Sequence, residues 1–444
     1  MVLQDNGGDN LTVSVNGNFK FATAVAYGAA YGVTVFAQPV GYSCSVTGDS
    51  GTVTANVTNV TVSCVKLPPM CFAYVTYATS GNVAAYKIDA TSGALASVGS
   101  VAAGSNPASI SVTPSGKLAY VANSGTSVVG TGSVTAYKID ATLGTLTEVA
   151  GSPFVTGTNP SDITVDPSGK FVYVTNRVYY SIYTANQPGY VSAYAIDSTT
   201  GALTFVNSVA TANGPSSVAI DPSGKFAYVA NAVSANISAY KINATTGALM
   251  INGTIGPDLT PPPVSNTPGR IIVYQPDTNP HPSSITIDPS GKYVYMTDSN
   301  SLNLSTYTID MTSGALNSTG IVTMLGASYS LSVNPSGKFA YAAIYSYYGF
   351  DYIAAFNIDA TLGTLTTITG SPFKGDASNY AKALTVDPTG KFAYMTNITN
   401  VAGNYSSNVV AYTIDVNGGL NSVGVPLVAG GIAPSFITTT CTIK

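Results

Sequence analysis

Charged side chains are scarce in this 444-residue sequence. Asp, Glu, Lys and Arg make up 8% of the residues, whereas about a quarter is usual for a soluble protein. The chain has one histidine (His281), one glutamate (Glu148) and two arginines (Arg177 and Arg270). Because acid–base catalysis draws heavily on such side chains, their shortage disfavours an enzyme. The formal net charge of −4 also predicts no basic surface for nucleic acid.

Long apolar runs are absent as well. No run approaches the roughly 20 residues that a membrane helix needs, so we expect no membrane span. Met1-Val2-Leu3-Gln4-Asp5 has neither the basic start nor the apolar core of a signal peptide. A low-charge composition rich in Thr, Asn and Tyr nevertheless favours an extracellular or cell-surface protein. We therefore expect the numbered chain to begin inside a longer precursor.

Cysteine is rare too, with four residues: Cys44, Cys64, Cys71 and Cys441. No two of them form a C-x-x-C pair, and a single histidine is available to complete a zinc site. We therefore predict no metal and no cofactor. Two disulfides are the better interpretation, and they indicate an oxidising compartment.

A short turn sequence, in contrast, recurs six times along the chain. In the copy Asp221-Pro222-Ser223-Gly224-Lys225, the aspartate accepts a local hydrogen bond, the proline presets φ, and the glycine takes the left-handed conformation that closes a hairpin. The copy lies between two apolar, β-rich runs, Ser217–Ile220 and Phe226–Ala230. The other copies begin at Thr113, Asp166, Asp288, Asn334 and Asp387.

A second recurrent turn indicates that each repeat contains four strands. In the repeat that spans residues 217–251 it is Asn243-Ala244-Thr245-Thr246-Gly247, which lies between the predicted third strand, Ile237–Lys241, and the fourth, Ala248–Ile251. Its relatives begin at Asp89, Asp140, Asp197, Asp310, Asp359 and Asp415. Seven four-stranded units of about 40 to 50 residues predict an all-β fold, a seven-bladed β-propeller.

The first unit lacks an innermost strand, since it begins at Met70 with its second strand. Residues 434–440 align with residues 107–113, so we predict that Phe436–Thr440 supply the missing strand and close the ring. Closure removes the open sheet edges that would otherwise aggregate. In the same alignment Cys71 and Cys441 lie one hairpin's width apart, near the separation that a disulfide prefers. We predict that they are bonded.

Residues 1–66 differ from the repeats and are predicted to form a separate all-β domain. Leu11–Val15 and Tyr31–Val35 alternate as strands do, and Asn16-Gly17 is a hairpin signal. Cys44 and Cys64 lie on different predicted strands, and a disulfide between them would stabilise so small a domain. Residues 65–69 form a short linker, and residues 67–444 form the propeller.

The N-terminal segment resembles the Ig-like β-sandwich repeats of large bacterial surface proteins. The matching motifs are Asn6-Gly7-Gly8-Asp9, Gln38-Pro39-x-Gly41-x-x-Cys44 and Asn56–Val60. In that family a further strand usually precedes the first motif, and here it is absent. The resemblance implies an unpaired sheet edge beside residues 2–15, which invites a strand from another chain. A segment upstream in the same chain is the alternative donor.

The repeats resemble the seven-bladed lactonase-type propellers, a family that includes bacterial 6-phosphogluconolactonase-like proteins and many surface or secreted propellers of unknown role. The resemblance rests on Asp221–Asn231, followed by Ser238–Ile242 and Thr246–Leu249, and it covers Met70 to Lys444. Because these residues form turns and strands, the resemblance implies the fold more strongly than an activity.

We predict no catalytic constellation. Glu148 lies on an outer strand. His281 precedes an innermost strand near the channel mouth, where a base could act, and Arg177 and Arg270 lie in variable connections that could hold an anion. Tyrosines also gather in these connections, where recognition usually occurs. As binding residues we predict Tyr179, Tyr180, Tyr183, Tyr190, Tyr345, Tyr347, Tyr348 and Tyr352. Alternatively, these rings pack the loops against the propeller.

These features favour a secreted bacterial structural protein: a self-assembling filament or adhesion subunit that uses strand donation to the N-terminal sandwich. The expected partners are other copies of the chain, with carbohydrate or a surface protein as further candidates. A lactonase-type hydrolase and a monomeric propeller that binds carbohydrate or protein are the alternatives. An enzyme should gather charged groups at one mouth of the channel, and that feature separates the hydrolase from the other two.

Overall fold

The computed structural model describes residues 1–126, 131–178, 188–251, 281–345, 350–377, 379–401, 404–424, 427–428 and 431–442. All the regular structure in these residues is β, as predicted, and they contain no helix with the length and apolar character of a membrane span. The chain divides into two compact units. Unit 1 comprises Met1–Met70 with Thr442–Lys444, and unit 2 comprises Cys71–Cys441.

Unit 1 contains a four-stranded and a two-stranded antiparallel sheet. The larger sheet has the order β2 (Asp9–Thr12), β1 (Val2–Asp5), β3 (Ala30–Ala37) and β5 (Ser50–Thr52). The smaller one pairs β4 (Tyr42–Thr47) with β6 (Thr61–Lys66), and the predicted disulfide joins Cys44 and Cys64 directly across this pair. The Ig-like character of the unit stays a prediction.

Of the strands within residues 2–15, β2 lies at the edge of its sheet and β1 lies inside it. Leu3 of β1 pairs with Leu11 of β2 on one side and with Val35 of β3 on the other. β1 therefore lies inside its sheet, because the hairpin that follows Asp5 places β2 beside it. β2 is the outermost strand and has one edge without a partner strand in the described residues.

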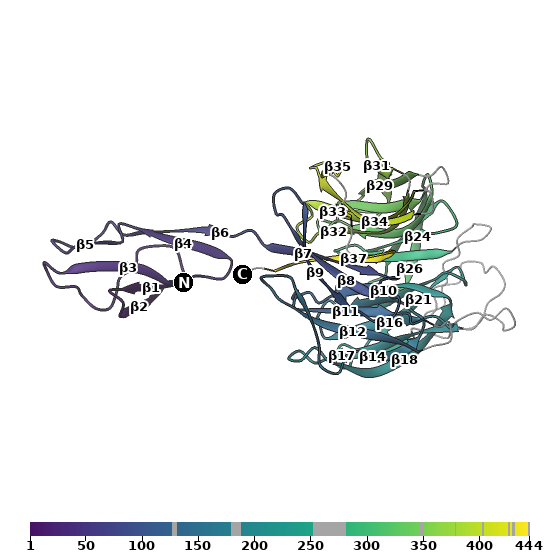
Figure 1. Ribbon diagram of the computed structural model, residues 1–444, viewed down its shortest axis with the longest axis horizontal. Coiled ribbons are helices and arrows are strands. Elements are labelled where there is room, and N and C mark those ends of the chain that lie inside the picture. Colours follow the sequence, from purple (N-terminus) through teal and green to yellow (C-terminus); the bar gives the residue numbers. More distant parts are fainter. Residues whose placement is uncertain are drawn as a thin grey trace. The chain divides into compact units, whose positions relative to one another are not determined.

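Unit 2 is a ring of seven blades in the described part of the chain (Figure 1). Blades 1 to 4, each from the innermost strand outward, are as follows: β37 (Pro434–Thr442), β7 (Met70–Tyr77), β8 (Asn82–Ile88), β9 (Leu95–Ala102); β10 (Pro107–Val112), β11 (Leu118–Asn123), β12 (Thr131–Ile139), β13 (Leu146–Glu148) with β14 (Phe154–Thr158) beside β12; β15 (Pro160–Val165), β16 (Phe171–Asn176), β17 (Pro188–Ile196), β18 (Leu203–Asn213); β19 (Pro215–Ile220), β20 (Phe226–Asn231), β21 (Asn236–Ile242), β22 (Leu249–Ile251).

Blades 5 to 7 follow the same order. Their strands are β23 (Pro282–Ile287), β24 (Tyr293–Asp298), β25 (Asn303–Ile309), β26 (Leu316–Thr323); β27 (Ala327–Val333), β28 (Phe339–Tyr345), β29 (Phe350–Ile358), β30 (Leu365–Thr367) with β31 (Phe373–Ala377) beside β29; β32 (Asn379–Val386), β33 (Phe392–Val401), β34 (Asn404–Ile414), β35 (Leu420–Ser422) with β36 (Leu427–Val428) beside β34.

The ring closes as predicted. Strand β37 is the innermost strand of blade 1, beside β7, and Cys71 and Cys441 form a disulfide across this pair. The apolar core lies between neighbouring blades, and one cluster joins Ala73 and Tyr86 of blade 1 to Tyr394 of blade 7. Closure therefore buries apolar surface as well as pairing the edge strand.

The recurrent turn follows the chemistry expected of it. Asp221 is fully buried, and its carboxylate accepts hydrogen bonds from the backbone N–H groups of Ser223 (3.0 Å), Lys225 (2.7 Å) and Phe226 (2.6 Å). Gly224 has a φ of +69°, which is costly for residues with a Cβ. The recurrent aspartate is thus occupied in the turn, and the adjoining lysine is exposed.

A tyrosine in the second strand of most blades ties that blade to its neighbour. The Tyr228 hydroxyl donates to the carbonyl of Gly314 (2.8 Å), which lies in the outer turn of the next blade. The equivalent pairs are Tyr74–Gly144, Tyr120–Gly201, Tyr173–Gly247, Tyr341–Gly418 and Tyr394–Gly93. Blade 5 differs, since Tyr293 bonds to Ala360 while the buried Tyr295 hydroxyl has no hydrogen-bond partner.

This difference supplies a matched pair of variants. Tyr228→Phe should lower the free energy of unfolding by about 1–1.5 kcal/mol, because the Gly314 carbonyl loses its partner. Tyr295→Phe removes a hydroxyl that is buried without a partner, so its cost should be below about 0.5 kcal/mol. Urea unfolding followed by tyrosine fluorescence measures both. Equal losses in the two variants would contradict this role for the tyrosine.

Candidate functional site

A cavity of about 390 Å³ forms the central channel, and the innermost strands of all seven blades line it. These strands begin at the face of unit 2 that carries the variable connections, which we call the variable face. The opposite face carries the short recurrent turns, and we call it the turn face. Most of the described lining side chains are Ser, Thr or aliphatic, and the charged ones among them are Asp162 and Lys382.

A β-bulge lies at the start of each innermost strand of blades 2 to 7, where the strand register shifts around one residue. We call the residue that this shift leaves unpaired the bulge residue. A bulge re-aims its side chain and is common near functional sites. The bulge residues are Ala108, Ser161, Ser216, Ser283, Tyr329 and Lys382.

The serines among them connect neighbouring blades. Ser161 donates through its hydroxyl to the carbonyl of Pro215 (2.7 Å) and Ser216 to that of Pro282 (2.7 Å). Ser283 donates in the same way to Ser328 (2.6 Å). Ser435, at the aligned place in blade 1, donates to Pro107 (2.5 Å). These hydroxyls are therefore engaged in holding the inner strands together.

Asp162 and Arg177 form the charged centre of blade 3. Asp162 accepts hydrogen bonds from the Ser109 hydroxyl (2.7 Å) and from the backbone N–H of Val218 (2.9 Å), so it spans three blades. Burial raises the pKa of Asp162, although these hydrogen bonds oppose the shift. Arg177 follows β16 at the variable face, and its Nε donates to the carbonyl of Pro215 (2.8 Å). Burial lowers the pKa of its guanidinium, while the charge of Asp162 acts in the opposite direction.

His281 lies at the same end of the channel as Arg177. It directly precedes Pro282, and its carbonyl accepts hydrogen bonds from the N–H (3.0 Å) and the hydroxyl (3.2 Å) of Ser299. Glu148, in contrast, ends the outermost strand β13 and is exposed. Arg270 falls outside the described residues. Of the four sequence candidates, Arg177 follows β16 and His281 precedes β23, both at the variable face, whereas Glu148 lies on the rim of a blade.

Lys382, the bulge residue of blade 7, lies beside Tyr329 of blade 6. Its Nζ lies 5.5 Å from the centroid of the Tyr329 ring, and burial lowers the pKa of its ammonium group. The neighbouring N–H of Ala381 donates to the buried carboxyl of Asp351 (2.9 Å), whose second oxygen has no hydrogen-bond partner. Burial raises the pKa of Asp351 to about 7.

Three of the predicted binding tyrosines lie within the described residues. Tyr190 accepts a hydrogen bond from the N–H of Thr158 (3.2 Å), and Tyr352 packs against a core cluster. Tyr345 stacks on Tyr380, with ring centroids 4.8 Å apart. Tyr179, Tyr180, Tyr183, Tyr347 and Tyr348 fall outside the described residues. The binding role of the set stays a prediction.

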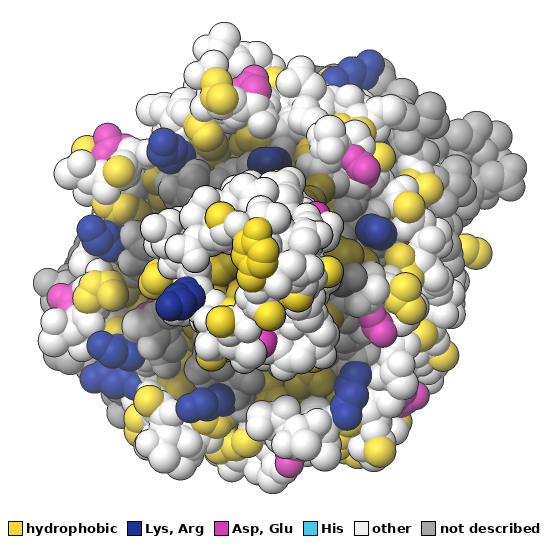
Figure 2. Space-filling view, turned by 90° about the vertical axis from the view of Figure 1, so that its left-hand side faces the viewer, with side chains coloured by type: hydrophobic (Ala, Val, Ile, Leu, Met, Phe, Trp, Pro, Cys, Tyr) yellow, Lys and Arg dark blue, Asp and Glu magenta, His cyan; other side chains and the backbone are white. Residues whose placement is uncertain are grey.

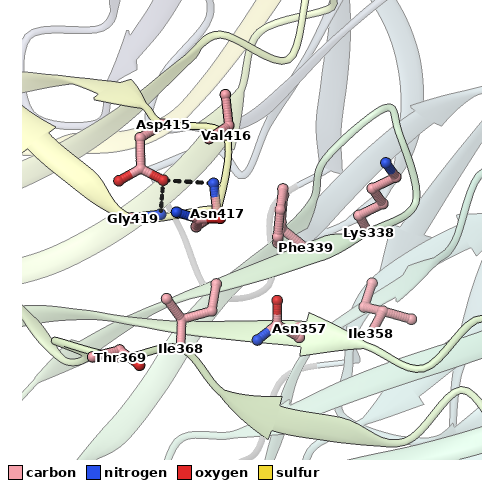
Figure 3. Close-up of a pocket in the computed structure, with 10 residues that line it drawn as sticks. All are labelled: Lys338, Phe339, Asn357, Ile358, Ile368, Thr369, Asp415, Val416, Asn417 and Gly419. Atoms are coloured by element: carbon pink, nitrogen blue, oxygen red, sulfur yellow. Dashed lines mark hydrogen bonds between the residues drawn. The ribbon is translucent and has the colours of Figure 1, made fainter.

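A second pocket, of about 660 Å³, lies at the turn-face side of blades 6 and 7 (Figure 3). Lys338 and Asp415 come from two recurrent turns, and Asp415 accepts hydrogen bonds from the N–H groups of Asn417 (2.7 Å) and Gly419 (2.9 Å). Its carboxylate is thus occupied in forming a turn. On the face drawn in Figure 2, Lys and Arg side chains are scattered singly and form no continuous basic patch.

Cys71, Asp387 and Cys441 are the one group of potential metal ligands that lie close together in the described chain. Both sulfur atoms belong to the disulfide, and Asp387 accepts hydrogen bonds within its turn, including one from the Phe392 N–H (2.8 Å). The group therefore belongs to the closure of the ring.

Sequence reasoning missed Asp162, Tyr329 and Lys382. The signal was present, because alignment of the innermost strands places Ser or Ala at the bulge residue in five blades and Tyr or Lys in the other two. The replacement of Ser or Ala by Tyr or Lys at this position becomes informative only when the structure shows the bulge, because the bulge determines where the side chain points.

The comparison with protein families finds one match. A family model described as a lactonase, seven-bladed β-propeller, matches residues 69–158 and 131–255. A comparison with curated proteins finds no match.

Solved structures share the fold of most of the chain. A candidate 6-phosphogluconolactonase from Bacteroides uniformis has a TM-score of 0.64 and 17% identity, with 84% of this chain and 99% of that chain covered. The periplasmic gluconolactonase of Pseudomonas aeruginosa gives 0.63 and 17%, covering 84% and 99%. A protein from Lactobacillus plantarum gives 0.63 and 18%, covering 84% and 100%. At such identities the likeness shows the fold.

These findings contradict the predicted filament or adhesion subunit, because the family match and the structural neighbours favour the lactonase-type alternative. The two disulfides indicate a location outside the cytoplasm. The four-stranded blades and their closure by β37 identify unit 2 as a seven-bladed β-propeller, and its residues 69–255 are similar to the lactonase propeller family.

Proposed function

We propose that unit 2 hydrolyses a sugar lactone at the variable-face end of its channel. The observation that carries this proposal is the placement of scarce titratable groups in a chain that is only 8% charged. Asp162 lines the channel, Arg177 donates to Pro215 at the start of β19, and His281 directly precedes β23. The gluconolactonase and candidate 6-phosphogluconolactonase with the same fold support the substrate class. An extracellular or cell-surface location, where disulfides persist, is part of the proposal.

Lactone hydrolysis needs a stabilised oxyanion and a base. Water adds to the ring carbonyl, the ring C–O bond then breaks, and the ring oxygen leaves as a hydroxyl, which yields an open-chain acid. Arg177, with its Nε fixed on Pro215, would donate to the developing oxyanion from its terminal nitrogens. His281 would take the proton from the attacking water and pass it to the leaving ring oxygen. Asp162 positions Arg177 through its charge.

The test is acid release from glucono-1,5-lactone in a pH-stat, with the spontaneous rate subtracted. Arg177→Lys should lower kcat/KM by about 100-fold, because lysine cannot keep both the Pro215 bond and the oxyanion contact. His281→Asn should lower kcat by a similar factor. Lys225→Met, on the exposed turn face, is the matched control and should leave the rate unchanged.

Thermal unfolding of each variant shows whether a loss of rate reflects a loss of structure. A wild-type rate equal to the spontaneous rate would reject the proposal. Full activity in folded Arg177→Lys would reject this site.

A further inference from the structure

We propose that Tyr329, Tyr380 and Lys382 form a binding platform for an acidic saccharide at the variable face of blades 6 and 7. This goes beyond the lactonase proposal, because such binding requires no hydrolysis. The three residues come from the innermost strands β27 and β32, beside the channel that both strands line.

The first observation is the change in use of the bulge residue. In blades 3, 4 and 5 it is a serine whose hydroxyl bonds to the next blade. Tyr329 and Lys382 replace this small residue by two of the largest side chains. Blade 6 meets blade 7 instead through the carboxyl of Asp351, which accepts from the N–H of Ala381. At blade 6 a residue other than the bulge residue thus contributes a contact with the next blade.

The second observation is the arrangement of the rings. Tyr380 lies against Tyr345 with an interplanar angle of 19°, yet 45% of Tyr380 is exposed, so its opposite face is open to solvent. Tyr329 is 43% exposed and has the Lys382 ammonium 5.5 Å from its ring centroid. Tyr380 and Lys382 are two residues apart on the same strand. Supported rings are stiff and present a flat apolar surface with polar edges.

The third observation concerns charge. Among the described residues, burial accounts for the lowered pKa of Lys382, and none of their carboxylates offsets the cost of holding this ammonium group half-buried. A carboxylate on a ligand would provide that offset through a charge-assisted hydrogen bond.

These features together favour a uronic-acid unit. The C–H groups on one side of a pyranose ring pack on an open tyrosine face, while its carboxylate reaches a cation and its hydroxyls meet the Ser and Thr groups of the channel lining. Nucleic acid needs a row of cations, and the platform has one. A peptide ligand would need apolar pockets for its side chains, whereas the described channel lining is largely hydroxylated.

The experiment is isothermal titration calorimetry of the full chain with trigalacturonic acid. Its fully methyl-esterified form is the matched probe without charge. The wild type should bind the acid more tightly than the ester by at least about tenfold, and salt should weaken only the acid. Lys382→Met should remove this preference. Tyr380→Ala should weaken both probes by about tenfold.

Tyr27→Ala, in unit 1 and 81% exposed, is the control and should bind as the wild type does. Three outcomes would overturn the proposal: no binding of either probe at millimolar concentration, unchanged binding by a folded Tyr380→Ala/Lys382→Met protein, or equally tight binding of a hexaglutamate peptide. The last result would show a site for acidic polymers in general. Retained melting temperature confirms that each variant is folded.

Discussion

Replacing Cys71 and Cys441 together by alanine is expected to lower the free energy of unfolding of unit 2 by about 6 kcal/mol. The disulfide closes a loop with a sequence separation of 370 residues. In the chain-entropy account such a cross-link removes a large number of conformations from the unfolded chain. Without it, β37 is held in blade 1 by strand pairing and packing alone. Urea unfolding of the variant, beside the wild type with and without a reductant, measures the effect.

The other disulfide provides the control. Cys44 and Cys64 are separated by 20 residues, for which the same account gives about 3 kcal/mol. Both cysteines lie in unit 1, so Cys44→Ala/Cys64→Ala should leave the unfolding transition of unit 2 in place. An equal loss of unit 2 stability from either pair would show that the stabilisation does not come from closing the ring.

The stability of unit 2 is expected to fall as the pH rises from about 4 to 7, because of Asp351. Its side chain is fully buried, and burial raises its pKa to about 7, so the folded protein keeps a proton that the unfolded chain has lost. The resulting stabilisation is complete below the unfolded pKa of about 4 and is lost as the pH passes the folded pKa. Over this range the loss is about 4 kcal/mol, at about 1.4 kcal/mol per pH unit.

Asp351→Asn isolates this effect from all other titrations. The amide oxygen can still accept the hydrogen bond from Ala381, but the side chain does not ionise. Urea midpoints between pH 4.5 and 8 should therefore decline more steeply for the wild type than for the variant, and the difference should level off above pH 8. Parallel pH curves for the two proteins would show that Asp351 does not control the dependence.

The repeats explain why the architecture was predictable. The turn that begins at Asp221 specifies a hairpin through local chemistry, and each of its six copies adds independent support for the same blade. The first blade has no innermost strand before Met70. Alignment with the other innermost strands was enough to assign this strand to Phe436–Thr440. The disulfide between Cys71 and Cys441 followed from that alignment.

The candidate site was harder to predict from the sequence, because its residues come together only in the folded structure. Asp162 is isolated in the sequence and acquires its role from Ser109 and Val218, which lie on the adjacent blades. The sequence around Lys382 is compatible with a regular strand, and only the register shift between Ala381 and Ala383 shows the bulge. The hairpin between Asp5 and Asp9, which pairs β1 with β2, was not predicted.

The position of β37 in blade 1 also constrains how the protein is made. At about 5 to 20 residues per second, a ribosome needs roughly 20 to 70 seconds to pass from Cys71 to Cys441. Throughout that interval β7 lacks its partner strand β37, while blades 2 to 7 are synthesised and can fold. The nascent chain is therefore an incomplete ring with an unpaired strand edge at β7. We expect a chaperone to bind at this edge.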